Sequence, residues 1–357
     1  MAITLDDLRR LAVVQTLFPP STLRRTLQAF GFVQADPIRA PARAQDLILR
    51  HRVKNYRAGD LERQYAKLGI EEDFFVNYGF VTKAVQRLMH PRGSKSTGPR
   101  KKVQLLLDFV RERGMVHPRE VDAHFSHGTV KNYWGGSSNA TTHLLDAMHY
   151  QGLLRVVRRD AGIRVYAAHQ HEPRPSDIDE RRVRIDSLVD VAVRIYAPLP
   201  ATTLSTLVRR LRYAVPHWQG ELPPALNRAR QRLSHTRLDG VDWYWPAETQ
   251  ITHAEHDLVR LLTPFDPVVW DRLRFEFLWG WAYRFEAYTP PSKRKLGYYA
   301  LPLLWRDRII GWGNLAVKEG ELRSEFGYIG SPPRDPIFQQ ELEAEVDRMK
   351  TFLRLQP

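Results

Sequence analysis

The spacing of apolar residues predicts a helix, a second helix and a strand at the start of the chain. Apolar residues recur at helical spacing from Leu8 to Phe18, and Pro19 ends that helix. A second helix is predicted at 23–30, which Gly31 closes ahead of a strand at Phe32 to Asp36. This order is the opening of a winged helix, and two more helices are predicted at 42–50 and 60–68.

Helices followed by a hairpin recur twice more along the chain. In the second repeat, helices are predicted at 103–113, 118–125 and 137–151, and strands at 153–159 and 163–168. In the third, helices are predicted at 178–196 and 204–211, and strands at 236–238 and 241–245. Asp239 with Gly240 between two β-forming runs is typical of a hairpin. The three repeats share a pattern and not residue identity.

Beyond Leu258 the helical period fades and short alternating strands are predicted at 274–277, 297–305, 308–317 and 321–328, before a helix that starts at Pro336. The fold class is therefore α+β: three tandem winged-helix units followed by a small β-domain and a C-terminal helix. Stretches rich in Pro, Gly and Ser at 90–102 and 173–176 mark boundaries. The predicted units are 1–97, 98–175, 176–250 and 251–357.

Charge points to a polyanionic partner. The chain has 54 Lys and Arg against 40 Asp and Glu, a formal net charge of +14. Such a balance favours nucleic acid and leaves an anionic membrane surface open. No run of about twenty apolar residues occurs, and the first residues are acidic where a signal peptide would be basic. We therefore expect a cytoplasmic, nucleoid-associated protein that does not bind a membrane.

The residue types also limit the cofactors. The chain has no cysteine, which excludes disulfides, iron-sulfur clusters and thiolate zinc sites. His124 with His127, and His253 with His256, do not match a recognised metal-binding spacing with an acidic partner. Neither a Walker motif nor a GxGxxG loop can be found. We expect no metal and no cofactor.

The strand at Phe32 to Asp36 carries the candidate chemistry. Side chains alternate along a strand, so Gln34 and Asp36 would face the same side, roughly 7 Å apart. Pro37 keeps Asp36 extended. An acid and an amide beside a basic run (Arg39, Arg43, Arg50, Arg52) suit hydrolysis on a polyanion. The alternative is a turn or helix cap, because Asp-Pro is common in that role and recurs at Asp266 and Asp335.

Two further groups have both a DNA-binding and a structural interpretation. Four arginines of the second hairpin would contact phosphate or only solvent: Arg155, Arg158, Arg159 and Arg164. The aromatic run Trp243 to Trp245 would wedge into DNA or pack against a neighbouring unit, and we favour packing.

The run GFVQADPIRAPARAQDLILRHRV resembles the N-terminal signature of the winged-helix DNA glycosylases that include the azinomycin-resistance and interstrand-crosslink glycosylases. Two distant blocks, at Leu261 to Arg272 and Glu286 to Trp305, are similar to the C-terminal blocks of that family. The family carries Gln-x-Gln or Gln-x-Asp at its site, and Gln34 with Asp36 fits the second form. The resemblance covers nearly the whole chain.

The resemblance implies a DNA glycosylase of base excision repair that removes N7-alkylguanine or unhooks interstrand crosslinks, and the residues near the strand favour a monofunctional enzyme that leaves an abasic site. Asp36 would stabilise the oxocarbenium-like sugar and activate water, while Gln34 would orient the water or hold the sugar. The first lysine is Lys54, so the strand offers no amine for a Schiff base. The enzyme would act as a monomer on double-stranded DNA carrying alkylated guanine or crosslinks.

The predicted DNA-binding residues are Arg39, Arg43, Arg50, Arg52, Arg100, Lys101, Lys102, Lys293, Arg294 and Lys295. The competing hypothesis is a non-enzymatic winged-helix regulator, because net charge and helix-hairpin units fit that class equally well.

Overall fold

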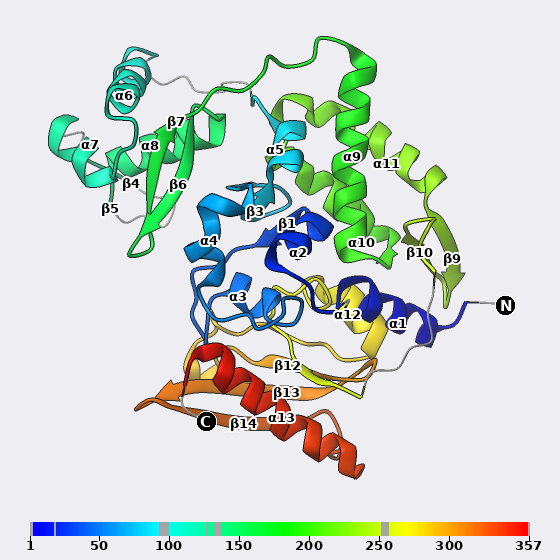
Figure 1. Ribbon diagram of the computed structural model, residues 1–357. Coiled ribbons are helices and arrows are strands. Elements are labelled where there is room, and N and C mark those ends of the chain that lie inside the picture. Colours follow the sequence, from blue (N-terminus) through cyan, green and yellow to red (C-terminus); the bar gives the residue numbers. More distant parts are fainter. Residues whose placement is uncertain are drawn as a thin grey trace.

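Helices and small antiparallel sheets make up the structure, a computed structural model that describes residues 3–17, 19–92, 100–125, 128–131, 137–250 and 257–355. In Figure 1 a sheet with the C-terminal helix lies at the bottom and the N-terminal elements lie above it. Two further groups of elements lie at the upper left and the upper right. The predicted α+β class is confirmed, and the number of winged helices stays a prediction.

The N-terminal stretch packs helices around a three-stranded sheet in the order β1, β3, β2. Thr22 caps the second helix and Gly31 ends it with φ 74°, as the sequence predicted for the end of this helix. The hairpin of β2 and β3 is an element that the apolar pattern missed. The elements are α1 (Leu5–Thr16), α2 (Leu23–Phe30), β1 (Phe32–Gln34), α3 (Ala44–Leu49), α4 (Asp60–Leu68), β2 (Ile70–Phe74), β3 (Tyr78–Thr82) and α5 (Lys83–Met89).

Gly79 lies opposite Gln34 in the pairing of β1 with β3. A Cβ atom at position 79 would lie 2.3 Å from the carbonyl oxygen of Val33 and 2.9 Å from the Cα atom of Gln34. Both contacts are with backbone, which cannot move aside without disturbing the ladder. Glycine is therefore required for β1 to approach β3 this closely, and a side chain at 79 would displace Gln34.

Residues 100–168 form a group with a core of its own, at the upper left of Figure 1. Its buried apolar side chains, from Leu106 to Tyr166, come from this stretch alone. Asn139 caps α8, so the helix predicted at 137–151 begins only at Ala140. The elements are α6 (Arg100–Arg113), α7 (Pro118–Phe125), β4 (Thr129–Lys131), β5 (Ser137–Asn139), α8 (Ala140–Gln151), β6 (Leu154–Asp160) and β7 (Ile163–Ala168).

The next group is organised around a long helix, α9, which contacts α1, α2, α5, α10 and α11. The predicted hairpin is present, and Trp243 and Trp245 are only 2% and 6% exposed, so the packing interpretation of these two aromatics is confirmed. The elements are α9 (Ile178–Tyr196), β8 (Leu199–Pro200), α10 (Ala201–Arg210), the 3-10 helices η1 (Leu211–Tyr213) and η2 (Pro216–Glu221), α11 (Leu222–Arg232), β9 (Ser234–Leu238) and β10 (Val241–Trp245).

The last part forms a four-stranded antiparallel sheet in the order β11, β12, β13, β14. The strand predicted at 274–277 is wrong, because this segment lies in helix α12. Asp271 caps that helix, and the buried Arg274 guanidinium donates to carbonyls of neighbouring segments. The elements are β11 (Val259–Leu261), α12 (Arg272–Trp279), the 3-10 helix η3 (Pro291–Lys293), β12 (Leu301–Trp305), β13 (Arg308–Lys318), β14 (Glu321–Tyr328) and α13 (Pro336–Leu353).

The first and last parts of the chain share one hydrophobic core. Leu27 and Phe30 of α2 are buried in the same cluster as Leu301 of β12 and Phe352 of α13. The sheet of the last part therefore supports the elements that carry the candidate site. The division into four units stays a prediction. In the described ranges, no helix has the length and apolar character needed to cross a membrane.

Candidate active site

The strand that carries Gln34 lies at the edge of the N-terminal sheet, where it pairs with β3, and all three of its side chains are buried. Phe32 and Val33 are buried, and the ladder continues past β1 because the N–H of Ala35 donates to the carbonyl of Tyr78 at 3.0 Å. The extended backbone thus reaches the residue before Asp36. This geometry supports the expectation that Gln34 and Asp36 face the same side of the strand.

Asp36 is a half-buried carboxylate whose Oδ1 accepts a hydrogen bond from the N–H of Ile38 at 2.9 Å. This is the turn geometry that an Asp-Pro sequence favours. Burial raises the pKa of Asp36, and the Ile38 N–H lowers it only in part. Among the described residues, no cation lowers this pKa. The turn occupies one oxygen and leaves the charge of the carboxylate without a counter-ion in that part of the chain.

An aromatic surface lies beside Asp36. Burial raises the pKa of Tyr299, and partial desolvation raises that of the exposed Tyr288; the Asp36 charge raises both further. Tyr299 is buried and its hydroxyl shares a hydrogen bond with Thr263 at 2.9 Å, whereas Tyr288 is 81% exposed. The Phe285 ring lies between them, with its centroid 5.2 Å from that of Tyr299 and 6.0 Å from that of Tyr288. Tyr288 is therefore the exposed end of this surface.

Gln34 is buried, and its carboxamide belongs to a chain of polar side chains. Its Oε1 accepts from Nδ2 of Asn77 at 2.9 Å, and Oδ1 of Asn77 accepts from the Arg210 guanidinium at 2.8 Å. That guanidinium lies 5.3 Å from the centroid of the Trp270 ring. Residues from β1, the β2–β3 turn, α10 and the segment before α12 thus meet next to the Gln34 side chain.

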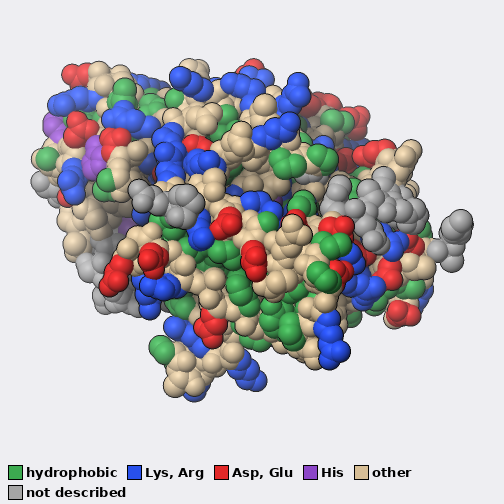
Figure 2. Space-filling view, turned by 60° about the horizontal axis from the view of Figure 1, so that its bottom comes forward, with side chains coloured by type: hydrophobic (Ala, Val, Ile, Leu, Met, Phe, Trp, Pro, Cys, Tyr) green, Lys and Arg blue, Asp and Glu red, His purple; other side chains and the backbone are tan. Residues whose placement is uncertain are grey.

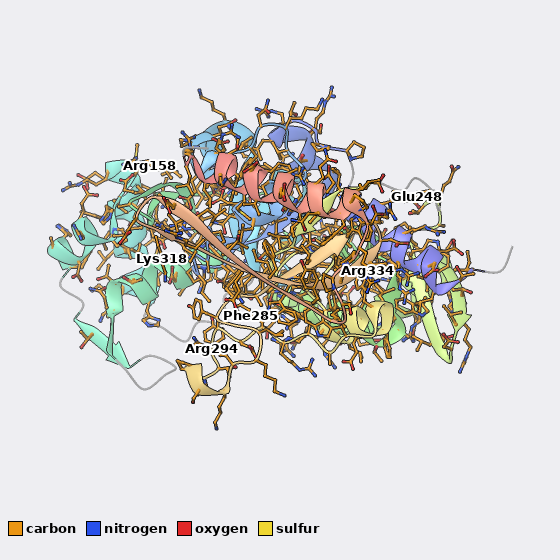
Figure 3. All side chains as sticks on the ribbon, turned by 90° about the horizontal axis from the view of Figure 1, so that it is seen from below. Arg158, Glu248, Phe285, Arg294, Lys318 and Arg334 are labelled. Carbon is orange, nitrogen blue, oxygen red and sulfur yellow. The ribbon has the colours of Figure 1, made fainter. Side chains whose placement is uncertain are left out.

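A basic loop projects next to the aromatic surface. The Glu286 carboxylate accepts hydrogen bonds from the N–H groups of Lys295 at 2.9 Å and Leu296 at 2.8 Å, which closes the loop. Although burial opposes it, these donors lower the pKa of Glu286. Figure 3 shows Arg294 on a short projecting segment with Phe285 at its base. In the view of Figure 2, hydrophobic side chains gather near the middle of the face, with Lys and Arg as well as Asp and Glu side chains around them.

A family model for DNA glycosylases of the AlkZ-like type matches residues 27–352. The chain belongs to the AlkZ-like DNA glycosylase family. Its fold is similar to that of the DNA glycosylase AlkZ of Streptomyces sahachiroi, with a TM-score of 0.63 and 13% identity over 100% of this chain and 99% of the other. The family inferred from the sequence motifs is confirmed, and DNA is the substrate that this family implies. The Gln-x-Asp form of the site stays a prediction.

The predicted DNA-binding side chains of the glycosylase divide into exposed and paired ones. The exposed ones are Arg39, Lys101, Lys102, Lys293 and Lys295. Arg294 is half-buried and its Nε donates to the carbonyl of Thr289 at 2.8 Å, while Arg43 forms an ion pair with Glu62. The side chain of Arg100 lies outside the described residues.

Arg50 and Arg52 do not belong to a DNA-binding surface, which corrects the prediction from the sequence. Arg50 forms a buried ion pair with Glu345 of α13. Arg52 is fully buried and donates to both oxygens of Asp266, at 2.8 and 2.9 Å. Positive charge in this run therefore neutralises internal carboxylates, and the Asp-Pro at Asp266 has the structural role that such pairs commonly have.

Strand β2 contains three buried acids that sequence reasoning missed. Glu71 pairs with Arg155 at 2.7 Å and Glu72 with Arg159 at 2.6 Å, so two arginines of the second hairpin bind β2 and not solvent or phosphate. The third acid, Asp73, accepts from Arg92 and His90. The sequence does carry one sign of this cluster: three acidic residues in a row between Ile70 and Phe74, in a chain that is otherwise basic.

Arg158 of the same hairpin is exposed and pairs with Asp160. Arg164 pairs with Asp146 at 2.7 Å and also lies near Glu72. All four arginines of this hairpin therefore have acidic partners within the protein, which neither interpretation from the sequence anticipated.

An open hollow of about 680 Å³ adjoins the aromatic surface, lined by residues that include Arg39, Pro41, Tyr298, Tyr299 and Asn314. Within the part of the chain that is described, no group of three or more His, Asp or Glu is arranged to hold a metal ion. Of the histidine pairs noted in the sequence, His127, His253 and His256 lie outside the described residues. His124 stacks on Phe109, with ring centroids 4.5 Å apart.

Proposed function

We propose that this glycosylase hydrolyses the N-glycosidic bond of N7-alkylguanine in double-stranded DNA, with Asp36 and Gln34 as the catalytic pair. The half-buried Asp36 carboxylate has no counter-ion among the described residues, and such a group suits the developing positive charge of an oxocarbenium-like sugar. Its free oxygen can accept the proton of an attacking water. This unpaired charge beside an aromatic surface is the observation that carries the proposal.

Alkylation at N7 makes guanine cationic, so the base leaves without protonation by a general acid. One carboxylate and one amide are then sufficient for the reaction. Water is the nucleophile in this scheme, and the product is an abasic site with an intact strand. The proposal is therefore a monofunctional enzyme, since no amine of the catalytic strand can form a Schiff base.

The surroundings of the site support bulky lesions as well as simple ones. The hollow beside Tyr299 has room for an alkyl substituent, and the exposed Tyr288 offers a face on which a base can stack. Lys293 and Lys295 on the adjoining loop are placed to contact phosphates. We extend the proposal to the unhooking of crosslinks by a monomer acting at the nucleoid in the cytoplasm.

The test is single-turnover release of 7-methylguanine from a defined duplex by an Asp36→Asn variant. Asn keeps the acceptor that Ile38 needs, so the turn is preserved. We expect the rate to fall by on the order of 10²-fold, with DNA affinity little changed. Asp335→Asn is a matched control, because Asp335 also precedes a proline and accepts from the N–H of Ile337 at 2.9 Å.

A folded Asp36→Asn protein that releases base at the wild-type rate would return Asp36 to the turn role alone. The monofunctional assignment has its own measurement. Products should break only after heat or alkali, and borohydride should trap no covalent protein-DNA species in good yield. Efficient trapping would replace hydrolysis by an amine mechanism.

A further inference from the structure

The direction of the Gln34 carboxamide is fixed by two residues, Asn77 and Arg210, which lie 133 positions apart in the sequence. An amide oxygen and nitrogen are interchangeable in shape, so their assignment rests on hydrogen-bond partners. Arg210 resolves the ambiguity, because a guanidinium only donates. The Asn77 atom that faces it at 2.8 Å must therefore be the oxygen.

The orientation of the Asn77 amide in turn fixes the orientation of the Gln34 carboxamide. With its oxygen bound to Arg210, Asn77 presents Nδ2 to Gln34, and the Gln34 atom that receives this donor at 2.9 Å must be Oε1. The nitrogen of Gln34 then faces away from Asn77. In the described ranges, Nε2 of Gln34 has no hydrogen-bond partner in the protein, so its N–H groups are available to a ligand.

Arg210, at the other end of this hydrogen-bonded series, is itself held in place. Arg210 is the last residue of α10 and its guanidinium also lies 3.4 Å from the carbonyl oxygen of Val76. Its flat face lies over Trp270, 5.3 Å from the ring centroid. Behind Gln34, Gly79 fixes how closely β1 approaches β3. Neither Asn77 nor Gln34 can reverse its amide without leaving two oxygens or two nitrogens facing each other.

We propose that Asn77 and Arg210 are positioning residues, which hold the Gln34 carboxamide so that it meets the substrate as a hydrogen-bond donor. This rests on the proposed catalytic pair of Gln34 and Asp36. The division of labour is then defined: Asp36 accepts the proton of water, and Gln34 donates to an oxygen of the lesion nucleotide or of that water. Asn77 and Arg210 themselves touch neither.

Asn77→Asp is the sharpest test. The new carboxylate has the shape of Asn and still accepts from Arg210, but it cannot donate to Gln34. Gln34 must then turn its nitrogen toward position 77 and its oxygen toward the substrate. We expect the single-turnover rate at saturating enzyme to fall by on the order of 10-fold or more, with duplex affinity and melting temperature close to wild type.

Two further variants separate orientation from charge. Asn77→Leu removes both hydrogen bonds without adding charge, and should slow base release less than Asn77→Asp because Gln34 can still adopt the productive direction. Arg210→Met removes the donor but keeps an apolar stem over Trp270, and should slow the reaction, whereas Arg210→Lys should restore most of the rate. Wild-type rates in both Asn77→Leu and Arg210→Met would overturn the proposal.

The Gln34→Ala background distinguishes this inference from the proposed function. If Gln34→Ala alone leaves the rate unchanged, the catalytic pair itself is wrong. If Gln34→Ala slows base release and Asn77→Asp adds no further loss in that background, the positioning role is supported. If the two losses multiply instead, Asn77 acts by another route and the proposal fails while the catalytic pair stands.

Discussion

The guanidinium of Arg52 donates hydrogen bonds to both carboxylate oxygens of Asp266, at 2.8 and 2.9 Å, although the two residues are 214 positions apart in the sequence. Both side chains are fully buried. The other donors of Arg52 reach the carbonyls of Thr16 and Ile48, each at 2.6 Å. The pair joins the run that follows β1 to the block at Leu261 to Arg272, so two stretches that resemble sequence motifs of the family meet in one ion pair.

Breaking this pair should lower the stability of the glycosylase. Asp266→Asn leaves the Arg52 charge buried and unpaired, and we expect the free energy of unfolding in urea to fall by about 3–5 kcal/mol. The control is Arg323→Met, which removes an exposed pair with Glu321 and should cost less than about 1 kcal/mol. If Asp266→Asn were as stable as wild type and bound DNA more weakly, the structural role of the Arg52–Asp266 pair would be wrong.

Binding of undamaged duplex should depend on salt through the projecting loop. Lys293 and Lys295 are exposed, so each is free to displace a counter-ion from phosphate. Replacing one by Met should reduce the slope of log affinity against log salt by about 0.9. Lys350→Met serves as the control, since Lys350 pairs with Asp347 on α13. An unchanged slope in both loop variants would remove this loop from the DNA interface.

Acid should loosen the contacts of strand β2 through Asp73. Burial raises the pKa of this carboxyl, but Arg92 and His90 outweigh it and hold the pKa well below its ordinary value. A depressed pKa means that the stabilisation is complete above the unfolded-state value of about 4 and is lost as the pH falls below it. Unfolding by urea between pH 6 and about pH 3 should follow this loss.

In Asp73→Asn this part of the pH dependence should vanish, and stability at neutral pH should already be lower by about 3 kcal/mol or more. The same acid dependence in Asp73→Asn and wild type would assign it to other carboxylates.

The sequence predicted the position of strand β1 because the signals for this strand are local. Gly31 ends α2, β1 follows, and Pro37 keeps Asp36 extended, all within one short run. The resemblance to a family then favoured a catalytic interpretation of Gln34 and Asp36 over an ordinary Asp-Pro turn. The terminal helix and both later hairpins were predicted for the same reason, since their apolar periods are complete within each segment.

What the sequence could not supply depends on distant partners. Arg52 has the composition signal of a phosphate ligand, and only Asp266 reveals it as a core residue. Arg274 to Phe277 alternate like a strand, but the cap at Asp271 and the carbonyls around Arg274 stabilise a helix. The partner of Gln34 likewise came from the turn of a hairpin that was not predicted.

The rate of base release should depend on pH through Asp36. Burial raises the pKa of this carboxyl, and the Ile38 N–H offsets the rise only in part. Because Asp36 is proposed to act in its ionised form, log rate should climb with pH and level off above a midpoint higher than the ordinary aspartate value of about 4. Bound DNA phosphates should raise the midpoint further, since negative charge disfavours the carboxylate.

The measurement is single-turnover release from an N7-methylguanine duplex across the acidic range, with release in the absence of enzyme subtracted at each pH. Asp36→Asn has no titrating group at this position, so its residual rate should be flat over the same range. A wild-type midpoint at or below the ordinary aspartate value would mean that the carboxyl is not buried when DNA is bound. An ascending limb that persists in Asp36→Asn would assign the titration to another residue, and Asp36 would lose its place as the base.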